Sequence, residues 1–453
     1  MIHRWSRALL ALCLAAAATP GTAQQNPPSF HARIDRASSD VMTKVIAWRR
    51  DFHQHPELGN REVRTGKVVA DHLRSLGLDV RANIARTGVV GVLRGGKPGP
   101  VVALRSDMDA LPVTEECELP FKSKVRTEYN GREVGVMHAC GHDAHMAMLM
   151  GAAEVLAAMK ADLPGTVVFV FQPAEEGAPS GEDGGATVMI KEGALDQPKV
   201  DAIFALHVFP YPTGSIVFRP RGLMASSDTV RIEVRGRQTH GALPWAGADP
   251  IVAASQIVLG LQTIISRQTN LTTAPAVITI GIMQAGNRAN IIPDEARLEG
   301  TVRTFDPAMR TKILDDIRRT ATGIAQAAGT TAEVQFVDGN PSVYNDPALT
   351  ERMTPSLKRV VTGEFDPNSA VTTTSEDFAE YLQKVPGMMF FLGVSPNGTD
   401  PSKVEPNHSP RFFVDEGALV TGVRALASVA VDYLSGRSRS GVTPVEGRSA
   451  DRR

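Results

Sequence analysis

Residues 167–176, Val-Val-Phe-Val-Phe-Gln-Pro-Ala-Glu-Glu, join an unbroken apolar run to a pair of acids. A short apolar run without polar alternation is typical of a strand buried on both faces of a sheet. Runs of the same kind occur at residues 88–93, 101–104, 200–206 and 388–392. Stretches with helical spacing separate them, at residues 34–52, 144–159, 346–361, 375–382 and 416–434. The sequence therefore predicts an α/β fold in which helices cover a mixed, mostly parallel sheet.

The stretch from residue 226 to residue 338 has another order of elements. It predicts a strand at 229–234, a helix at 250–266, strands at 276–282 and 295–303, a helix at 307–327 and a strand at 332–337. This β-α-β-β-α-β order is the split pattern of a ferredoxin-like unit, which can fold independently. We therefore expect residues 226–338 to be an inserted domain. The main domain is then discontinuous, formed by residues 24–225 and 339–434.

The overall charge is close to neutral. The 453 residues include 48 Lys and Arg against 49 Asp and Glu, a formal net charge of -1. Without a basic field, nucleic acid or an acidic membrane surface is not expected as the main partner. A small molecule or a short peptide is the better expectation.

The two ends of the chain have compositions unlike the rest. A positive start at His3, Arg4 and Arg7 precedes an apolar run, which small residues break before Gln24. This order is typical of a secretory signal, so residues 1–23 are predicted to be a signal peptide and the protein to be exported, into the periplasm. No later stretch is expected to reach transmembrane length. The Gly-, Ser- and Arg-rich residues 435–453 are predicted to be a disordered tail.

Removal of the signal would leave two cysteines, Cys117 and Cys140. An oxidising compartment ordinarily favours a disulfide. Cys140, however, lies within the segment His-Ala-Cys-Gly-His-Asp-Ala-His at residues 138–145, where a thiolate beside imidazoles is typical of a metal ligand. We therefore expect no disulfide, and we expect Cys117 to fill space in the core.

Four polar clusters follow apolar runs, where the carboxyl ends of strands form ligand sites in α/β proteins. Their candidate ligands are Cys140, His142, Glu175, Glu176, His207 and His408. Thiolate, imidazole and carboxylate together suit a divalent cation such as Zn or Mn, and the surplus of donors suggests two ions sharing ligands. Taken singly, an adjacent Glu pair is commonly solvated and a lone histidine at a strand end is commonly structural.

Several motifs in one order resemble family 20 of the metallopeptidases, in its branch of N-acyl-amino-acid amidohydrolases. They occupy residues 49–58 (RRDFHQHPEL), 104–112 (LRSDMDALP), 138–145, 172–177 (QPAEEG), 240–242 (HGA), 290–293 (NIIP), 375–378 (SEDF) and 408–410 (HSP). The resemblance runs from about Trp48 to Leu434.

The resemblance implies two divalent metal ions per subunit, Mn or Zn first, with Co or Ni also compatible. It implies that Cys140, His142, Glu176, His207 and His408 are the ligands and that Glu175 is the general base. Asp107 and Asp109 lie where other branches carry a histidine ligand and its orienting aspartate. Here they are interpreted as buried acids that hold the ligands in place, and His138, Asp143 and His145 are interpreted as further supporting residues.

The resemblance also implies a homodimer formed through the inserted domain, which acts as a lid. His240 would reach the site of the partner subunit and stabilise the oxyanion, while Asn290 and Arg303 would hold the free carboxylate of the substrate. The alternatives are a structural role for His240 and a surface charge for Arg303. Trp245 either lines a substrate pocket or packs beneath its loop.

The function implied is hydrolysis of the amide bond of N-acyl amino acids, related to hippurate, to a carboxylic acid and a free amino acid. Glu175 would accept a proton from water and return it to the leaving amine. A carboxypeptidase or dipeptidase acting on short peptides is the first alternative. The others are a non-catalytic protein that binds such conjugates and a thiol enzyme with Cys140 as nucleophile.

Overall fold

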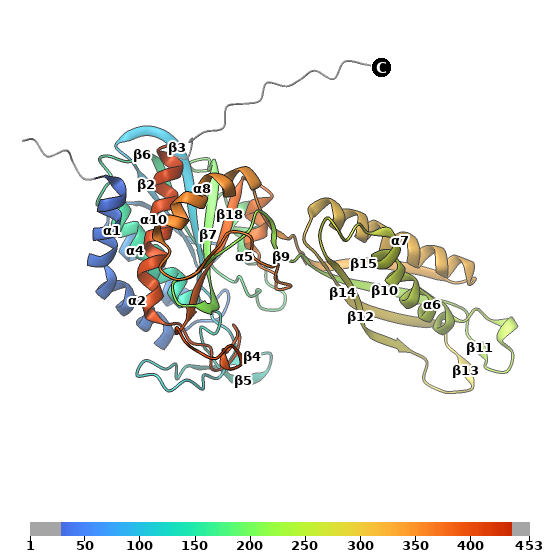
Figure 1. Ribbon diagram of the computed structural model, residues 1–453. Helices are drawn as coiled ribbons and strands as arrows, with labels where there is room; N and C mark the ends of the chain where they lie inside the picture. Colours follow the sequence, from blue (N-terminus) through green and yellow to red (C-terminus); the bar gives the residue numbers. More distant parts are fainter. Residues whose placement is uncertain (1–28, 437–453) are drawn as a thin grey trace, which may run out of the picture.

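The computed structural model describes residues 29–436, and Figure 1 shows an α/β body joined to a smaller unit. The predicted signal peptide, and the predicted tail from residue 437 onward, lie outside the described residues.

An eight-stranded mixed sheet forms the centre of the body, in the order β1-β2-β6-β3-β7-β18-β8-β17. Its strands are β1 (Asp79–Ile84), β2 (Gly88–Arg94), β3 (Lys97–Asp107), β6 (Pro164–Gln172), β7 (Ala202–Pro212), β8 (Ile216–Val217), β17 (Phe365–Asp366) and β18 (Gly387–Ser395). The central strands β6, β3, β7 and β18 pair in parallel, while β1 and β2 add an antiparallel edge. The predicted α/β class and mostly parallel sheet are confirmed.

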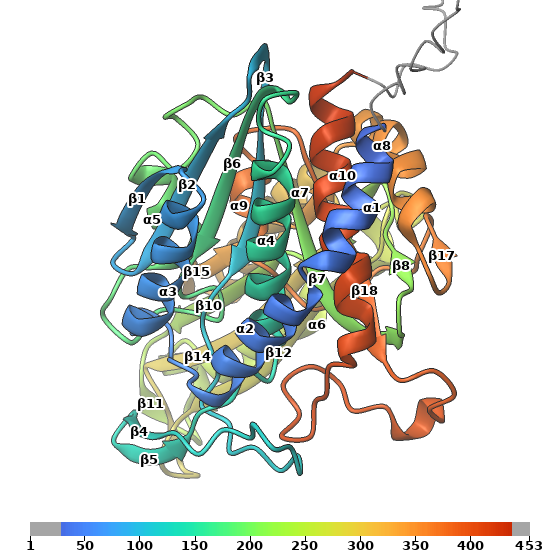
Figure 2. The ribbon, with the colours of Figure 1, turned by 90° about the vertical axis from the view of Figure 1, so that its left-hand side faces the viewer.

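Helices cover both faces of this sheet. One face packs against α1 (Phe30–Asp40), α2 (Met42–Gln54), α3 (Val63–Ser75), α4 (His142–Ala157), α8 (Pro347–Val360) and α10 (Leu419–Leu434), most of which lie in front of the strands in Figure 2. The other face packs against α5 (Gly185–Lys191) and α9 (Phe378–Leu382). Because both faces are covered, strand β18 is buried along its whole length, as an unbroken apolar run predicts.

Several local features differ from the expected elements, and α3, β1 and α5 were not predicted. The expected helix at 34–52 is two helices, α1 and α2, separated at Val41. The expected helix at 375–382 begins only at Phe378, because Glu376 and Asp377 bind other groups. A hairpin of β4 (Arg126–Tyr129) and β5 (Arg132–Gly135) was not predicted.

The smaller unit consists of a four-stranded antiparallel sheet and two helices. Its elements are β10 (Ser227–Arg235), α6 (Pro250–Thr263), β12 (Ala276–Ala285), β14 (Glu295–Thr304), α7 (Pro307–Ala327) and β15 (Thr331–Asn340). The sheet order β12-β14-β10-β15 and the chain order agree with the predicted β-α-β-β-α-β unit. Both helices begin at a proline after an aspartate, and Asp249 and Asp306 accept backbone N–H groups of the first turns.

Short elements complete the chain. The two body segments beside the insertion meet in a two-stranded sheet of β9 (Arg221–Met224) and β16 (Val343–Asn345). At the far end of the smaller unit, β11 (Thr239–His240) pairs with β13 (Ile291–Ile292).

Two helical stretches of the described chain are long and apolar enough to cross a membrane by length and composition, Pro250–Gln268 and Glu416–Leu434. The prediction that no later stretch reaches this length is wrong by that criterion. The second stretch is 78% buried inside the protein, as a core helix is, whereas the first is only 33% buried. The first stretch therefore leaves much of its apolar surface uncovered.

Candidate active site

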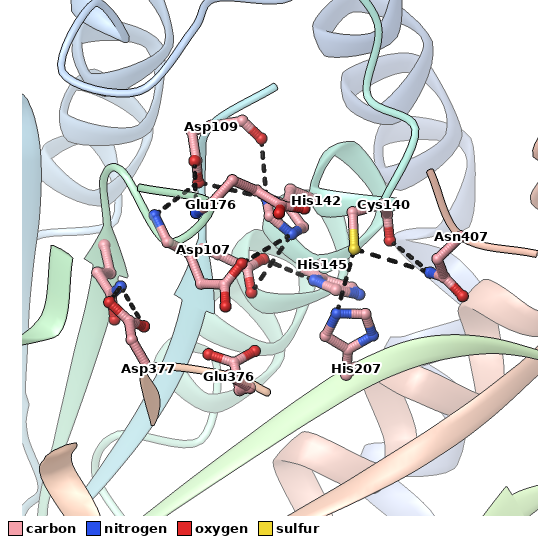
Figure 3. A network of polar contacts seen from close by, with 12 residues as sticks. Asp107, Asp109, Cys140, His142, His145, Glu176, His207, Glu376, Asp377 and Asn407 are labelled. Atoms are coloured by element: carbon pink, nitrogen blue, oxygen red, sulfur yellow. Dashed lines mark hydrogen bonds and ion pairs between the residues drawn. The ribbon is translucent and has the colours of Figure 1, made fainter. Parts of the chain in front are cut away.

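A cluster of thiol, imidazole and carboxylate groups lies at the carboxyl edge of the main sheet (Figure 3). Strand β3 ends at Asp107, the turn after β6 carries Glu175 and Glu176, β7 carries His207, and α4 begins at His142. Because these strands are parallel neighbours, side chains at their ends meet at one place.

Gly141 sets the start of α4 beside β7. Its φ of 90° is left-handed, and a Cβ there would lie 2.3 Å from a methyl group of Val208. Only glycine fits this turn, which places Cys140 and His142 on either side of it.

His142 has one ring nitrogen committed and one free. Its Nδ1 donates to the backbone oxygen of Asp109 at 2.8 Å, while its buried Nε2 has no hydrogen-bond partner. That Nε2 lies 3.8 Å from an Asp107 oxygen and 3.9 Å from a Glu175 oxygen. Burial by itself would lower the pKa of His142, but Asp107, Asp109 and Glu176 outweigh it and raise the pKa to about 10. The surroundings of His142 therefore favour a positive charge.

His207 is held in the same way. Its Nδ1 donates to the Val208 oxygen at 2.7 Å, and its Nε2 lies 3.5 Å from the Cys140 sulfur. Metal-binding histidines usually donate the other ring N–H to a carbonyl or carboxylate, so both His142 and His207 have the tautomer of a ligand.

His145 differs from these two histidines because both of its nitrogens are used. Its Nδ1 donates to Asp107 at 2.6 Å, and its Nε2 accepts the N–H of Val208 at 2.7 Å. Asp107, His142, His145 and His207 lie close enough together to hold an ion, but His145 would first have to give up the Val208 bond. His145 therefore supports the cluster, as predicted for it from the sequence.

The two described cysteines are free thiols. Burial, and then Glu176 and Glu175, raise the pKa of Cys140 well above its ordinary value. A thiol in such surroundings is a poor nucleophile without a cation nearby, which disfavours the thiol-enzyme alternative. Cys117 is half-buried and packs against the core, with its sulfur 3.5 Å from the Phe412 oxygen.

Two buried acids bind the backbone of the turn that carries Glu175 and Glu176. Asp109 accepts the backbone N–H groups of Glu175 and Glu176, both at 3.0 Å. Glu62 accepts the N–H of Ala174 at 2.9 Å, and Ala174 has the left-handed φ of 51°. The acids compensate this strained backbone by fixing its N–H groups.

His408 completes the cluster at its exposed side. Its Nε2 lies 2.9 Å from a Glu176 oxygen, and its side chain is 53% exposed. The neighbouring Asn407 donates to the backbone oxygens of Cys140 and Val208, which holds this loop against the cluster. The site thus runs from the buried His142 to the exposed His408.

A buried guanidinium lies near the turn that carries Glu175 and Glu176, named the catalytic turn after the predicted role of Glu175. Arg105 donates to Asp107 at 2.7 Å, Glu376 at 2.9 Å, Asp377 at 3.1 Å and Gln172 at 3.0 Å. Burial raises the pKa of Asp377 to about 8, with Arg105 opposing the rise. The single cation therefore neutralises a set of acids that could not otherwise be buried together.

Glu175 lies among like charges. Burial, and then Glu376 and Glu176, raise its pKa well above the ordinary value. A carboxyl group with a raised pKa is suited to accept a proton and to return it near neutral pH. A cavity of about 170 Å³ opens beside it, also lined by Cys140, His207 and His408.

The structure brings together six of the predicted site residues and separates three. The six are Cys140, His142, Glu175, Glu176, His207 and His408. His240 and Asn290 line another cavity, of about 490 Å³, at the far end of the smaller unit. Arg303 lies at the end of β14 and donates to the Ser226 oxygen at 3.3 Å.

Among the supporting residues, the sequence motifs contained Arg105 and Glu376 without revealing their role. The supporting role of Glu62 was not predicted from the sequence. The one indication of it is that Glu62 lies four residues after the end of the first motif. His138, predicted as a supporting residue, is buried with neither ring nitrogen hydrogen-bonded, and burial lowers its pKa to about 3. Asp143 supports the site through Arg49 and His53, both of which contact its carboxylate.

Comparison with known proteins identifies the chain as a hydrolase that acts on amide or peptide bonds. It belongs to peptidase family M20/M25/M40, whose family model matches residues 103–432. This confirms the resemblance found in the sequence.

Individual relatives match over most of their length. Thermostable carboxypeptidase 1 of Saccharolobus solfataricus is 41% identical over 86% of this chain and 95% of its own. N-acetylcysteine deacetylase of Bacillus subtilis is 40% identical over 86% of this chain and 97% of its own. The crystal structure of the Bacillus subtilis YXEP protein, described as a dinuclear metal-binding peptidase of the M20 family, is 38% identical over 88% of this chain and 99% of its own, with a TM-score of 0.73.

Proposed function

We propose that the protein is a dinuclear, metal-dependent amidohydrolase that releases a free amino acid from N-acyl amino acids. One observation carries this proposal: His142 and His207 each bind a backbone carbonyl through Nδ1 and direct Nε2 into the cluster. This leaves a lone pair on each Nε2 for a cation, beside a thiol and carboxylates.

The residues present fit two divalent ions. Cys140, His142, Glu176, His207 and His408 would hold them, with Mn or Zn as the first candidates and Co or Ni compatible. The unpartnered Nε2 of His142 and the raised pKa of this residue both indicate a place for positive charge. Bound there, divalent ions would lower the pKa of water and polarise the substrate carbonyl.

Glu175 would act as the general base and then as the general acid. It lies at the cavity but is assigned no ligand role, since Glu176 is the acid that contacts His408. Glu175 would take the proton from the attacking water and give it to the leaving amine. Asp109 fixes the backbone of this turn, so the carboxylate stays aimed at the reacting atoms.

The substrate class rests on the relatives. One acts as a deacetylase of N-acetylcysteine by its name, which supports an N-acyl amino acid here. The carboxypeptidase, at 41% identity, supports a second candidate, cleavage of the last bond of a short peptide. Both reactions break an amide bond next to a residue with a free carboxylate.

We propose that a second copy of the chain completes the site through the inserted domain. Strand β12 is an edge of its sheet and exposes Val277, Ile282 and Met283. The adjacent helix α6 exposes Val252 and Leu259, the latter 71%. An edge strand and an apolar helix side by side suit symmetric pairing of two copies.

In this dimer, His240 would reach the partner's cluster and donate to the oxyanion, because its strand β11 lies at the far end of the smaller unit whereas the strands of the cluster lie in the body (Figure 1). Asn290 lies with it, and Arg303 lies at the junction of the two domains; both would bind the substrate carboxylate. Export through a signal at residues 1–23 stays a prediction. N-terminal sequencing of the protein secreted by its host tests it, and a start near residue 24 is expected.

The decisive experiment measures release of amino acids from a panel of N-acetyl and N-benzoyl amino acids and dipeptides by mass spectrometry. The protein is first chelated and then resupplied with Mn or Zn. We expect turnover only with metal and faster cleavage of N-acyl amino acids than of dipeptides. Faster cleavage of peptides would favour the carboxypeptidase, and no turnover of any substrate with metal bound would refute the hydrolase.

Two variants sharpen this test. Glu175→Gln should keep its metal content, measured by plasma mass spectrometry, while kcat falls by a factor of at least about 100, as expected for loss of a general base. Glu333→Gln, an exposed change on β15, is the matched control and should leave kcat and metal content unchanged. Full activity of Glu175→Gln would refute its role as base.

A further inference from the structure

A second cavity, separate from the small one, opens beside the catalytic turn and shares Glu176 with it. Its volume is about 540 Å³, within the range of about 300–1,000 Å³ typical of small-molecule sites. Its lining includes strand β4 and the turn that follows it in the unpredicted hairpin, residues 126–130, together with residues of the loop at 56–61. We call this space the hairpin cavity.

The hairpin cavity adjoins the catalytic cluster. Its lining includes Asp109, which holds the catalytic turn, and Glu176, which also lines the small cavity. The turn with Glu175 and Glu176 therefore lies between two spaces of unequal size. An amide whose carbonyl sits at this turn extends in two directions, and the larger space suits the larger arm.

Several charged side chains that line the hairpin cavity already bind other groups of the protein. Arg61 binds Glu182 at 2.7 Å, and Arg126 pairs with Glu133 across the hairpin. The carboxylate of Glu57 accepts two backbone N–H groups of α3. Because both arginines are paired with acids, their attraction for an anionic arm is weakened.

Glu128, an exposed acid on the lining, adds negative charge to the cavity. An arm that carries a free carboxylate is therefore disfavoured there.

The remaining lining is uncharged and combines apolar side chains with the polar Thr127 and Asn130. Leu58, Leu111, Val125 and Val136 form much of the wall, and the ring of Tyr129 stands on the hairpin, 37% exposed. Apolar walls with an aromatic ring suit an uncharged aromatic or medium-length aliphatic group.

We propose that the hairpin cavity binds the acyl group of the substrate and selects an uncharged aromatic or medium-length aliphatic acyl chain. This inference rests on the proposed amidohydrolase function. The amino acid, with its free carboxylate, then lies on the other side of the catalytic turn. The hairpin of β4 and β5 is thus the element that sets acyl preference.

The test compares kcat/KM for N-benzoyl-, N-octanoyl- and N-acetyl-alanine in the metal-loaded protein. Tyr129→Ala removes the ring from the cavity, and Thr127→Trp fills the cavity from the same strand. In Tyr129→Ala the ratio of benzoyl to acetyl kcat/KM should fall about 3- to 10-fold, the loss expected for part of an aromatic contact. In Thr127→Trp the octanoyl to acetyl ratio should fall about 10-fold or more.

The matched control is Arg132→Ala, which changes the same hairpin at a residue outside the cavity lining. It should leave both ratios unchanged. Unchanged ratios in both cavity variants would overturn the inference even though the protein still cleaves N-acyl amino acids. If the unaltered protein released no amino acid from any of the three substrates, the proposed function itself would fail and the inference with it.

Discussion

Replacement of Arg105 by methionine tests the electrostatics beneath the catalytic turn. The guanidinium is buried and contacts Asp107, Glu376 and Asp377, so its removal leaves three buried acids without their cation. Breaking a buried ion pair on one side costs about 3–5 kcal/mol, a large part of the roughly 5–15 kcal/mol that stabilises a protein. We expect a loss of that size in the free energy of unfolding at pH 8.

The loss should depend on pH in a defined direction. Burial raises the pKa of Asp377 to about 8, while Arg105 opposes this rise. Without Arg105 the folded variant keeps extra protons to higher pH, so its stability falls faster than that of the unaltered protein as pH rises. Each extra proton is worth about 1.4 kcal/mol per pH unit above the pKa of Asp377 in the unaltered protein, so the deficit at pH 9 should exceed the deficit at pH 7 by about 1 kcal/mol.

Urea unfolding of the chelated protein, followed by tryptophan fluorescence, measures these values. Trp48 packs against the main core and reports its unfolding, whereas Trp245 is 78% exposed and changes little. Arg235→Met is the control, because this arginine forms only an exposed pair with Glu233, which water and salt screen. A deficit below about 1 kcal/mol for Arg105→Met, or one equal at pH 7 and pH 9, would refute the reasoning.

Three further predictions concern the cluster and its support. After chelation, His142→Ala should bind no more than one equivalent of Zn by calorimetry, whereas His145→Ala should weaken binding by only about 10–100-fold; equal losses would contradict the different tautomers. Burial, and then Asp109, raise the pKa of Glu62 from 4.5 to about 7, so unfolding free energy should fall as pH rises through that window. Glu62→Gln should flatten this slope in urea titrations at pH 5 and pH 7, and an unchanged slope would exclude Glu62 as its source. In chelated protein, iodoacetamide should label Cys140 at less than about one-tenth of the rate of free cysteine, and rapid labelling would revive the thiol-enzyme alternative.

The sequence predicted the sheet well because its evidence was local. Unbroken apolar runs such as residues 167–171 became buried strands, and the aspartate-proline pairs fixed the starts of α6 and α7. The pairing directions were harder to predict. Strand β2 pairs antiparallel to β6 although both are apolar runs, because direction depends on contacts distant in the sequence.

The candidate site was predictable where its residues stand next to strand ends. Its support was not, because Glu62 and Arg105 act through residues far along the chain: Glu62 binds Ala174, and Arg105 binds Glu376. The hairpin of β4 and β5 escaped prediction since its short strands are mostly exposed and lack an apolar run. Local sequence patterns predict which residues are buried, but they do not predict which distant residue pairs with a buried charge.

The position of His240 at the far end of the inserted domain has a genetic consequence. If the partner supplies this histidine, the two residues of one working site are encoded by different copies of the chain. A chain with Glu175→Gln and a chain with His240→Ala would each be inactive alone. Mixed and allowed to exchange subunits, they would restore about a quarter of the sites, because each mixed dimer contains one site with both residues intact. Two defective alleles would then complement each other within one cell.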